Sequence, residues 1–235
     1  MDQNPLERVT TLTVDVFGTI LDPSESLVPA ASRFLRSKGL SIEGSAFCAR
    51  WFARQRIEQL QETLMMTGHT GYLEVSRRAL VYSLCGEGVE FTEGEVSELM
   101  KAWEELSPFE DAVQALNRLS ERYRLAVLSN GNPWLLKHLL SERVEVSFDA
   151  VVSVQEAGAF KPHPSVYRTA ARILESEPDQ IMMVTAHSID VIGARSCGYR
   201  GAFVNRHKLP FEETIYQPDV TTGDLRELAS YLLDR

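Results

Sequence analysis

The spacing of hydrophobic residues changes twice along the chain. Near the N-terminus, an apolar run from Thr11 ends at Asp15, and Gly18-Thr19 then begins a loop, a pattern typical of a buried strand that ends in a turn. From about residue 24 to about residue 105, apolar residues recur at helical spacing and strand signals are almost absent. After this stretch, short apolar runs alternate with helical segments. The pattern therefore predicts one strand, a group of helices, and then alternating helices and strands.

The middle stretch predicts four helices, separated by glycines. They are expected at residues 27–35, 46–66, 72–84 and 93–105. Thr92, with Glu95 three residues later, predicts an N-terminal capping box for the last of them. On the longest helix the apolar positions include Phe47, Trp51, Ile57, Leu60 and Leu64.

The rest of the chain predicts a parallel sheet. Strands are expected at 124–129, 148–153, 180–185 and 201–205, with helices at about 110–121, 133–142, 164–175 and 188–197. Strands that alternate with helices of this length form βαβ units. We therefore expect an α/β fold in which a doubly wound, Rossmann-like core carries an inserted all-helical cap domain. The expected boundaries are 1–22 and 106–235 for the core, and 23–105 for the cap, which would lie over the strand ends.

Composition narrows the class of protein. A chain of 235 residues with 44% hydrophobic residues can bury one core and a smaller second unit. Its 33 acidic residues against 24 lysines and arginines argue against nucleic acid or an anionic membrane as a steady partner. Neither a secretory signal nor an apolar run of ~18 residues is evident. The three widely spaced cysteines fit a reducing compartment, so we expect a soluble cytoplasmic protein.

Polar residues follow the predicted strands. The carboxyl ends of parallel strands meet at one edge of a sheet, where open α/β folds hold their active sites. The residues at these ends are Asp15, Ser129, Asn130, Gly131, Lys161, Thr185, Ala186, His187 and Asp190. The set contains a nucleophile, a hydroxyl group, a cation and a second carboxylate, which together could form an active site.

Each of these residues, taken alone, has an ordinary structural explanation. Asp15 could be a turn residue, and Ser129 could belong to a helix cap. Lys161 could lie in a surface loop, and His187 and Asp190 could cap the helix that follows them. The functional interpretation rests on their joint occurrence at the ends of different strands.

The residue two places after Asp15 is Phe17. If Asp15 is a nucleophile, no second carboxylate stands beside it to protonate a leaving group. The departing group would therefore have to leave without a proton.

This combination resembles the haloacid dehalogenase superfamily and, within it, the 2-haloacid dehalogenases. Four motifs occur in order between about residues 10 and 206. They are Asp-Val-Phe-Gly-Thr at 15–19, Leu-Ser-Asn-Gly at 128–131, Phe-Lys-Pro at 160–162 with Tyr167, and Val-Thr-Ala-His-Ser-Ile-Asp at 184–190 followed by Gly-Ala-Arg at 193–195. Phosphatases of the superfamily carry Asp-x-Asp in the first motif and bind magnesium through an additional acid in the fourth. Here Phe17 replaces the second aspartate, and Thr185, Ala186 and His187 stand where that acid is expected.

The resemblance implies a metal-independent hydrolase that needs no cofactor. Asp15 would displace halide from a small 2-haloalkanoic acid and form an aspartyl ester, whose hydrolysis gives a 2-hydroxy acid. Lys161 would keep Asp15 ionised, Thr19 and Ser129 would position the reacting groups, and Asp190 would activate water. The residues expected to bind the substrate are Phe17, Asn130, Tyr167, Thr185, His187, Ile189 and Arg54. A homodimer formed through the cap helices is also possible on this basis.

Two positions depart from the family pattern. In 2-haloacid dehalogenases an arginine directly follows a tryptophan on the first long cap helix and receives the halide, whereas here Phe52 follows Trp51. Arg54 and Arg56 are the nearest candidates on the following turn, with Arg50 on the other side, and Arg54 lies on roughly the face of Trp51. His187 stands where asparagine is the best-known residue.

Three alternatives therefore remain open. One is a related hydrolase that acts on another small carboxylic acid, such as a strained-ring amino acid. The second is a phosphatase of the superfamily, and the third is a non-catalytic interaction protein on the same fold.

Overall fold

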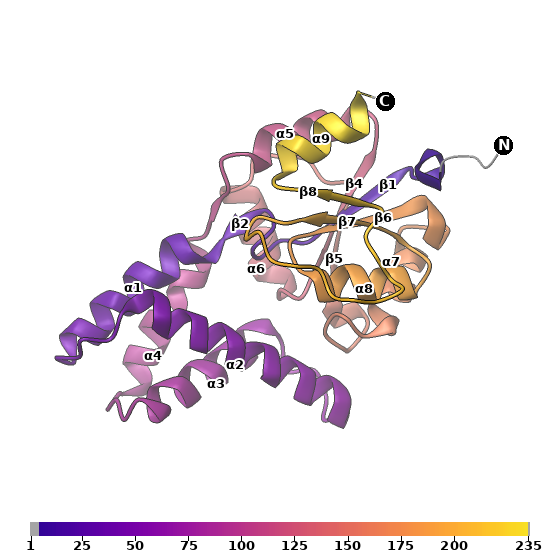
Figure 1. Ribbon diagram of the computed structural model, residues 1–235. Helices are drawn as coiled ribbons and strands as arrows, with labels where there is room; N and C mark the ends of the chain where they lie inside the picture. The colour runs from indigo at the N-terminus through magenta and orange to yellow at the C-terminus, as the bar shows by residue number, and fades with distance from the viewer. Residues whose placement is uncertain (1–4, 235) are drawn as a thin grey trace.

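A six-stranded parallel sheet forms the centre of the computed structural model, which describes residues 5–234 (Figure 1). Its strand order is β5-β4-β1-β6-β7-β8. The strands are β1 (Thr11–Val14), β4 (Arg124–Ser129), β5 (Ala150–Ser153), β6 (Ile181–Thr185), β7 (Arg200–Val204) and β8 (Val220–Thr222). In the centre, Thr11 lies opposite Arg124 of β4 and Ile181 of β6. The predicted doubly wound α/β core is confirmed.

Helices cover both faces of this sheet. They are α5 (Ala112–Ser120), α6 (Pro133–Glu142), α7 (Pro164–Ile173), α8 (Ser188–Ser196) and α9 (Leu225–Leu233). The leucines of α5, α6 and α9 pack with Leu12 and Val14 of β1 on one face. On the other face, α7 and α8 cover Leu128 and Met183 (Figure 1). Because both faces are covered, β1 is buried along its whole length. Within residues 5–234, none of the helices has the length and apolar character needed to cross a membrane.

The helices of residues 23–104 form a second group beside the sheet (Figure 1). They are α1 (Pro23–Ser37), α2 (Gly44–Met65), α3 (Tyr72–Gly86), α4 (Glu93–Met100) and the short 3-10 helix η2 (Lys101–Glu104). We call residues 23–104 the cap. The predicted capping box at Thr92 and Glu95 is present at the start of α4. The expected domain boundary at 23–105 stays a prediction, although all these helices lie inside it.

A two-stranded antiparallel ribbon joins the cap to the core. It consists of β2 (Leu21–Asp22) and β3 (Ser107–Pro108), with Leu21 opposite Pro108 and Asp22 opposite Ser107. The two chain crossings therefore lie side by side. The sequence pattern did not predict this ribbon, because each of its strands contains only two residues.

Helix α2 buries different residues from those its hydrophobic pattern suggests. Phe47 and Trp51 are buried, but Ile57, Leu60 and Leu64 are exposed. The buried side of the helix continues from Trp51 through Gln55, Gln59 and Glu62. Half of this helix thus packs like a core helix, whereas the other half turns polar groups inward.

The C-terminal elements also differ from the expectation. The strand β8 and the helix α9 were not predicted. The strand is a short Val-Thr-Thr segment without an apolar run, so it carries no strand signal. The predicted helix at 93–105 is divided into α4 and η2.

Candidate active site

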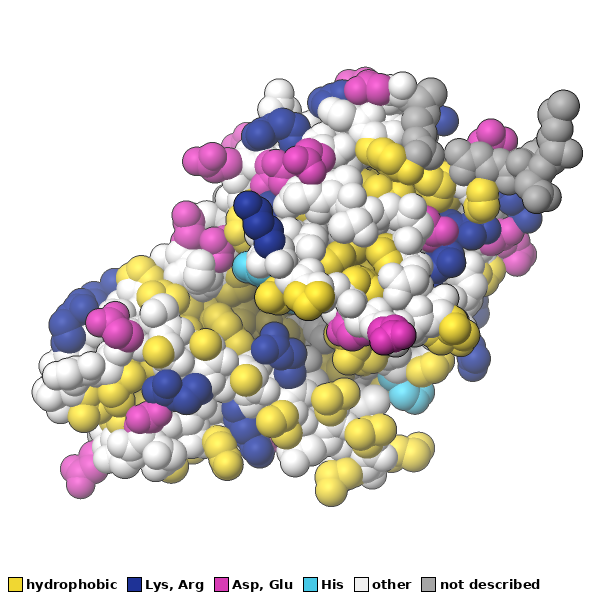
Figure 2. Space-filling model, viewed as in Figure 1, with side chains coloured by type: hydrophobic (Ala, Val, Ile, Leu, Met, Phe, Trp, Pro, Cys, Tyr) yellow, Lys and Arg dark blue, Asp and Glu magenta, His cyan; other side chains and the backbone are white. Residues whose placement is uncertain are grey.

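A cavity of about 400 Å³ lies between the carboxyl ends of the strands and the cap. Asp15, Asn130, Lys161, His187 and Asp190 line it from the core. The cap contributes Phe52, Gln55, Arg56, Gln59, Leu60, Tyr72 and Trp103. Figure 2 shows the molecular surface hollowed between the cap and the core, with hydrophobic side chains deep in the hollow.

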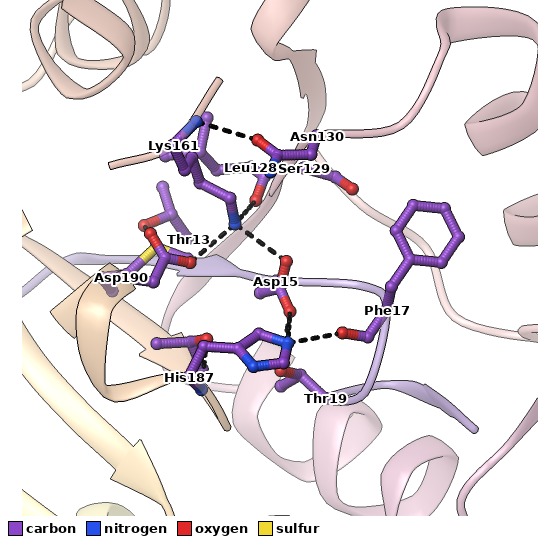
Figure 3. Close-up of polar contacts among 12 residues, drawn as sticks. Thr13, Asp15, Phe17, Thr19, Leu128, Ser129, Asn130, Lys161, His187 and Asp190 are labelled. Carbon is purple, nitrogen blue, oxygen red and sulfur yellow. Dashed lines mark hydrogen bonds and ion pairs between the residues drawn. The ribbon is translucent and has the colours of Figure 1, made fainter. Parts of the chain in front are cut away.

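The Lys161 ammonium group lies between two carboxylates (Figure 3). Its Nζ atom is 2.8 Å from Oδ1 of Asp15 and 2.7 Å from Oδ2 of Asp190. It also donates a hydrogen bond to the carbonyl of Leu128 at 2.9 Å. An ammonium group has three donors, so all three are used. The side chains of the three charged residues are only 4–6% exposed.

Charge pairing keeps Asp15 and Lys161 ionised. Burial alone would raise the pKa of Asp15, but the Lys161 and His187 side chains and a hydrogen bond from Thr19 hold this pKa below its ordinary value. Burial alone would lower the pKa of Lys161, but Asp15 and Asp190 hold it above its ordinary value. At neutral pH the cavity therefore contains a carboxylate anion that is ready to act as a nucleophile.

Thr19 orients the Asp15 carboxylate from below the cavity. Its hydroxyl donates to Oδ2 of Asp15 at 2.8 Å and accepts from the backbone N–H of Ala186 at 2.9 Å. His187 Nε2 lies 3.7 Å from the same carboxylate oxygen and 2.8 Å from the carbonyl of Phe17 (Figure 3). Because a carbonyl can only accept, this nitrogen must carry a proton. Thr19 is fully buried and does not line the cavity itself.

Tyr167 holds Asp190 in place from behind. Its hydroxyl donates to Oδ1 of Asp190 at 2.5 Å. Burial and the neighbouring Asp190 carboxylate raise the pKa of Tyr167 well above its usual value, so the hydroxyl stays protonated. A Cβ atom at Gly193 would lie 2.6 Å from this hydroxyl, which explains the need for glycine at that position. Tyr167 is buried and does not face the cavity.

The loop after β4 connects Lys161 to the cap. Asn130 Oδ1 accepts the backbone N–H of Lys161 at 3.0 Å, and Asn130 Nδ2 donates to Gln59 of α2 at 3.3 Å. Ser129 is fully buried and accepts the N–H of Gly131 at 3.2 Å, so its side chain stabilises the loop. A Cβ atom at Gly131 would lie 2.9 Å from the Phe17 ring, and glycine therefore allows this close approach.

Aromatic rings form the other part of the cavity wall. Phe17 of the core and Tyr72 of the cap stack with ring centroids 4.4 Å apart and planes 6° apart. Trp103 meets both rings edge-on, at 5.7 and 5.2 Å. The cavity thus combines an apolar aromatic wall with a few fixed charges, which suits a small molecule that carries one ionic group.

The expectation that Arg54 faces the cavity is wrong. Its guanidinium group binds Glu58 on the next helical turn and stacks 3.9 Å above the ring of Tyr82, so it turns away from the cavity. Arg56 lines the cavity instead, next to Gln55. Gln55 is 4% exposed, and its Nε2 has no hydrogen-bond partner in the part of the chain that the structure describes.

The structure brings most of the predicted residues together but divides them into two layers. Those that line the cavity are Asp15, Phe17, Asn130, Lys161, His187, Ile189 and Asp190. Those that lie behind them are Thr19, Ser129, Tyr167 and Thr185. Thr185 accepts the backbone N–H of His187 at 3.0 Å and so supports the loop that follows β6.

Residues of the cap were missed by the sequence interpretation. For Gln55 and Gln59 a signal existed, because they continue the buried side of α2 four and eight residues after Trp51. Tyr72 and Trp103 carried no such signal, since their role depends on where the cap docks.

No group of three His, Cys, Asp or Glu side chains within residues 5–234 is arranged to hold a metal ion. At the strand ends, the acids that face each other are Asp15 and Asp190, and Lys161 occupies the space between them. Any metal-binding proposal for this site would have to displace that cation.

Comparisons with known proteins agree on the family. The family described as haloacid dehalogenase-like hydrolase matches residues 9–198. An (S)-2-haloacid dehalogenase of Xanthobacter autotrophicus is 30% identical over 84% of this chain and 76% of its own length. Haloacetate dehalogenase H-2 of a Moraxella species is 28% identical over 92% of this chain and 94% of its own length.

Solved structures extend this similarity to the whole fold. The L-2-haloacid dehalogenase of Xanthobacter autotrophicus superposes with a TM-score of 0.85 at 27% identity, over 95% of this chain and 98% of that chain. This coverage includes the cap as well as the core. The sequence match and the shared fold lead to the same conclusion: the chain belongs to the haloacid dehalogenase-like hydrolases.

Proposed function

We propose that the protein is a 2-haloacid dehalogenase that forms an aspartyl ester without a metal ion. The observation that carries this proposal is the pairing of buried Asp15 with Lys161, next to Phe17. The carboxylate is kept ionised. Phe17 stands two residues after it in place of an acid that could protonate a leaving group, and the second carboxylate of the cavity, Asp190, is bound to Lys161. Halide is a leaving group that needs no proton. The named activities of the relatives from Xanthobacter and Moraxella support this substrate class.

In the first step, an oxygen of Asp15 forms a bond to the carbon that carries the halogen. The carbon–halogen bond breaks, and its electron pair leaves with the halide. The aromatic wall of Phe17 and Tyr72 excludes water from the reacting centre, which strengthens the fixed charges around it. Asn130, His187 and Ile189 line the cavity and are assigned to substrate binding.

In the second step, water attacks the carbonyl carbon of the ester. Asp190 takes a proton from this water, the ester bond breaks, and the 2-hydroxy acid leaves after its oxygen regains that proton. The regenerated Asp15 carboxyl group loses the second proton of the water to solvent and becomes a carboxylate again. Esterification removes the negative charge of Asp15, so Lys161 is then paired with Asp190 alone. Tyr167 keeps Asp190 directed toward the cavity throughout.

We assign reception of the leaving halide to Arg56 and Gln55 on α2. Arg56 lines the cavity and forms no ion pair with any residue in the range 5–234. The unpartnered Nε2 of Gln55 is a buried donor, and a buried donor without a partner is costly unless a ligand uses it. Arg54 is already paired with Glu58 and does not serve this role.

The domain boundaries, the oligomeric state and the cellular location are also part of the proposal. We propose that residues 23–105 form a cap domain on a core of residues 1–22 and 106–235. The exposed apolar side chains at the end of α2, Leu64, Met65 and Met66, support a homodimer formed through the cap. The cysteines of the described chain are unpaired, which supports a cytoplasmic location.

The test is a halide-release screen over small 2-haloacids, followed by a single turnover in heavy-oxygen water. The proposal expects label in Asp15 after one turnover, because water attacks the aspartyl carbonyl. Asp15→Asn is the matched control and should release no halide. Label found only in the product would indicate direct attack by water and contradict the ester.

A parallel assay separates the alternatives. Strong magnesium-dependent hydrolysis of an aryl phosphate would favour a phosphatase. Ester formation at Asp15 with a strained-ring amino acid, in the absence of halide release from any haloacid, would keep the nucleophile and change the substrate.

A further inference from the structure

Two asparagines in the loop after β4 contact the cap. Asn130 donates to Gln59 of α2 at 3.3 Å, and Asn132 Oδ1 accepts the backbone N–H of Leu73 in α3 at 3.0 Å. Asn130 lines the cavity and belongs to the site described above. Asn132 does not line the cavity, and no role in the proposed reaction has been assigned to it.

Asn132 occupies the N-cap position of α6, immediately before Pro133. Asparagine is among the best N-cap residues, because its side-chain oxygen accepts a hydrogen bond from the first turn of its own helix. Here the side chain makes no such bond to α6. Its acceptor is directed to a different helix, which belongs to the cap.

Helix α3 lacks a cap from its own segment of chain. Its N-cap residue is Gly71, which has no side chain, so the first N–H groups of the helix need an acceptor from elsewhere. Asn132 supplies one of these acceptors. Gly71 also fits the contact sterically, because a Cβ atom there would lie 2.6 Å from Asn132 Nδ2 and its φ angle is +97°.

Tyr72, which lies between Gly71 and Leu73, connects this contact to the cavity. Tyr72 is the first residue of the helix and stacks on Phe17, two residues after the nucleophile Asp15. The Asn132–Leu73 bond fixes the start of α3 relative to the core, and therefore fixes the position of the Tyr72 ring in the cavity wall.

The geometry points to Asn132 as a positioning residue that docks the cap and, through Tyr72, sets the width of the cavity over Asp15. The docking part of this inference is independent of the reaction. Its effect on turnover rests on the dehalogenase function proposed above.

The first test is amide hydrogen exchange on the full chain, which needs no substrate. Asn132→Leu removes the acceptor at similar size, Asn132→Ser can cap α6 but has a shorter side chain, and Asn132→Asp keeps an acceptor that reaches Leu73. The Leu73 amide should exchange about fivefold to tenfold faster in the Leu and Ser variants, and as in wild type in the Asp variant. The Leu135 amide of α6 is the internal control and should not change in the Leu variant, since Asn132 does not cap that helix. Unchanged exchange at Leu73 in the Leu and Ser variants would overturn the inference.

The second test measures halide release and separates positioning from folding. Asn132→Leu should raise KM for a two-carbon haloacid about fivefold to tenfold and change kcat less, because the wall loosens while Asp15 and Lys161 stay in place. In a Tyr72→Ala background the same substitution should have little further effect on KM, since the ring it positions is gone. Equal effects on KM in both backgrounds would show that Asn132 does not act through Tyr72, and a lower melting temperature with unchanged KM would show that it acts only on stability; either result would overturn the positioning role. If wild-type protein releases no halide, the exchange result still decides the docking role.

Discussion

The strands of the sheet and the helix α2 differ in which side chains they bury. In β1 and β4 every residue except Arg124 is buried, including Thr11, Thr13 and Ser129, as expected for strands that are covered on both faces. In α2 the buried side begins with Phe47 and Trp51 and continues with Gln55, Gln59 and Glu62, whereas Leu64 is 78% exposed. A hydrophobic pattern therefore predicts where an element packs, but not where it borders a cavity.

Each buried polar residue of α2 has a physical reason for its position. Gln59 meets Asn130 of the core, and Gln55 faces the cavity. Burial alone would raise the pKa of Glu62, but hydrogen bonds from Thr70 and Arg78 hold it below its ordinary value. Glu62 therefore stays ionised and ties α2 to Thr70 before α3 and to Arg78 within it.

The largest loss of activity is expected at Asp15, at the end of β1. Asp15→Asn removes the proposed nucleophile and keeps one of the two oxygen acceptors that Lys161 and Thr19 use. Halide release should fall by at least ~10³-fold, as happens when a covalent catalyst loses its nucleophile. Ion chromatography of released halide measures the effect, and a melting temperature close to wild type shows that the protein is folded. Substantial residual turnover would refute Asp15 as the nucleophile.

A second substitution tests the charge pairing at the strand ends. Lys161→Met leaves Asp15 and Asp190 buried without their shared cation and should lower the free energy of unfolding by about 3–5 kcal/mol. The pKa of Asp15 should rise, so the remaining activity should increase with pH where the wild-type activity is flat. Urea unfolding and a pH–rate profile check both effects. A flat profile in the variant would contradict the role of Lys161.

The same pairing fixes the sign of the pH dependence of stability. The folded-state pKa of Asp15 lies below its unfolded value, so its contribution to stability is fully present above the unfolded value of ~4 and is lost as pH falls toward the folded value. In Asp15→Asn the loss of stability below ~pH 4 should therefore be shallower than in wild type.

Two substitutions on α2 test whether its buried glutamines differ in their contribution to stability. Gln55→Leu removes a buried donor without a partner and should raise the free energy of unfolding by ~1 kcal/mol, while it weakens halide release. Gln59→Leu breaks the bond to Asn130 and should lower the same free energy by ~1 kcal/mol. Chemical denaturation of both variants is the measurement. Equal changes of the same sign would mean that the glutamine without a partner and the glutamine bonded to Asn130 contribute alike to stability.

The smallest effect is expected on the exposed side of the same helix. Leu64→Gln should change the stability of the folded subunit by no more than ~0.5 kcal/mol, because the side chain is not packed. Sedimentation measures the proposed dimer in the same variant. A large loss of subunit stability would show that Leu64 is buried in the working protein.

The sequence predicted the strand-end chemistry because strand ends are local features. Asp15, Lys161 and Asp190 follow recognisable strands, and a parallel sheet brings such ends to one edge, where they meet at 2.7–2.8 Å. Arg54 was placed wrongly because the rotation of α2 is set by its contacts with the cap and the core. Tyr72 could not be predicted, since its place in the cavity depends on a hydrogen bond between segments 59 residues apart.

The ribbon of β2 and β3 makes the cap a segment that evolution can exchange as a unit. Leu21 pairs with Pro108, so the polypeptide leaves the core and returns to it at neighbouring points. An insertion whose two ends meet in this way imposes little strain on the host domain, whatever its length. Recombination could therefore exchange the helical unit as a cassette and change substrate preference, while the carboxylates and the lysine at the strand ends are inherited unchanged.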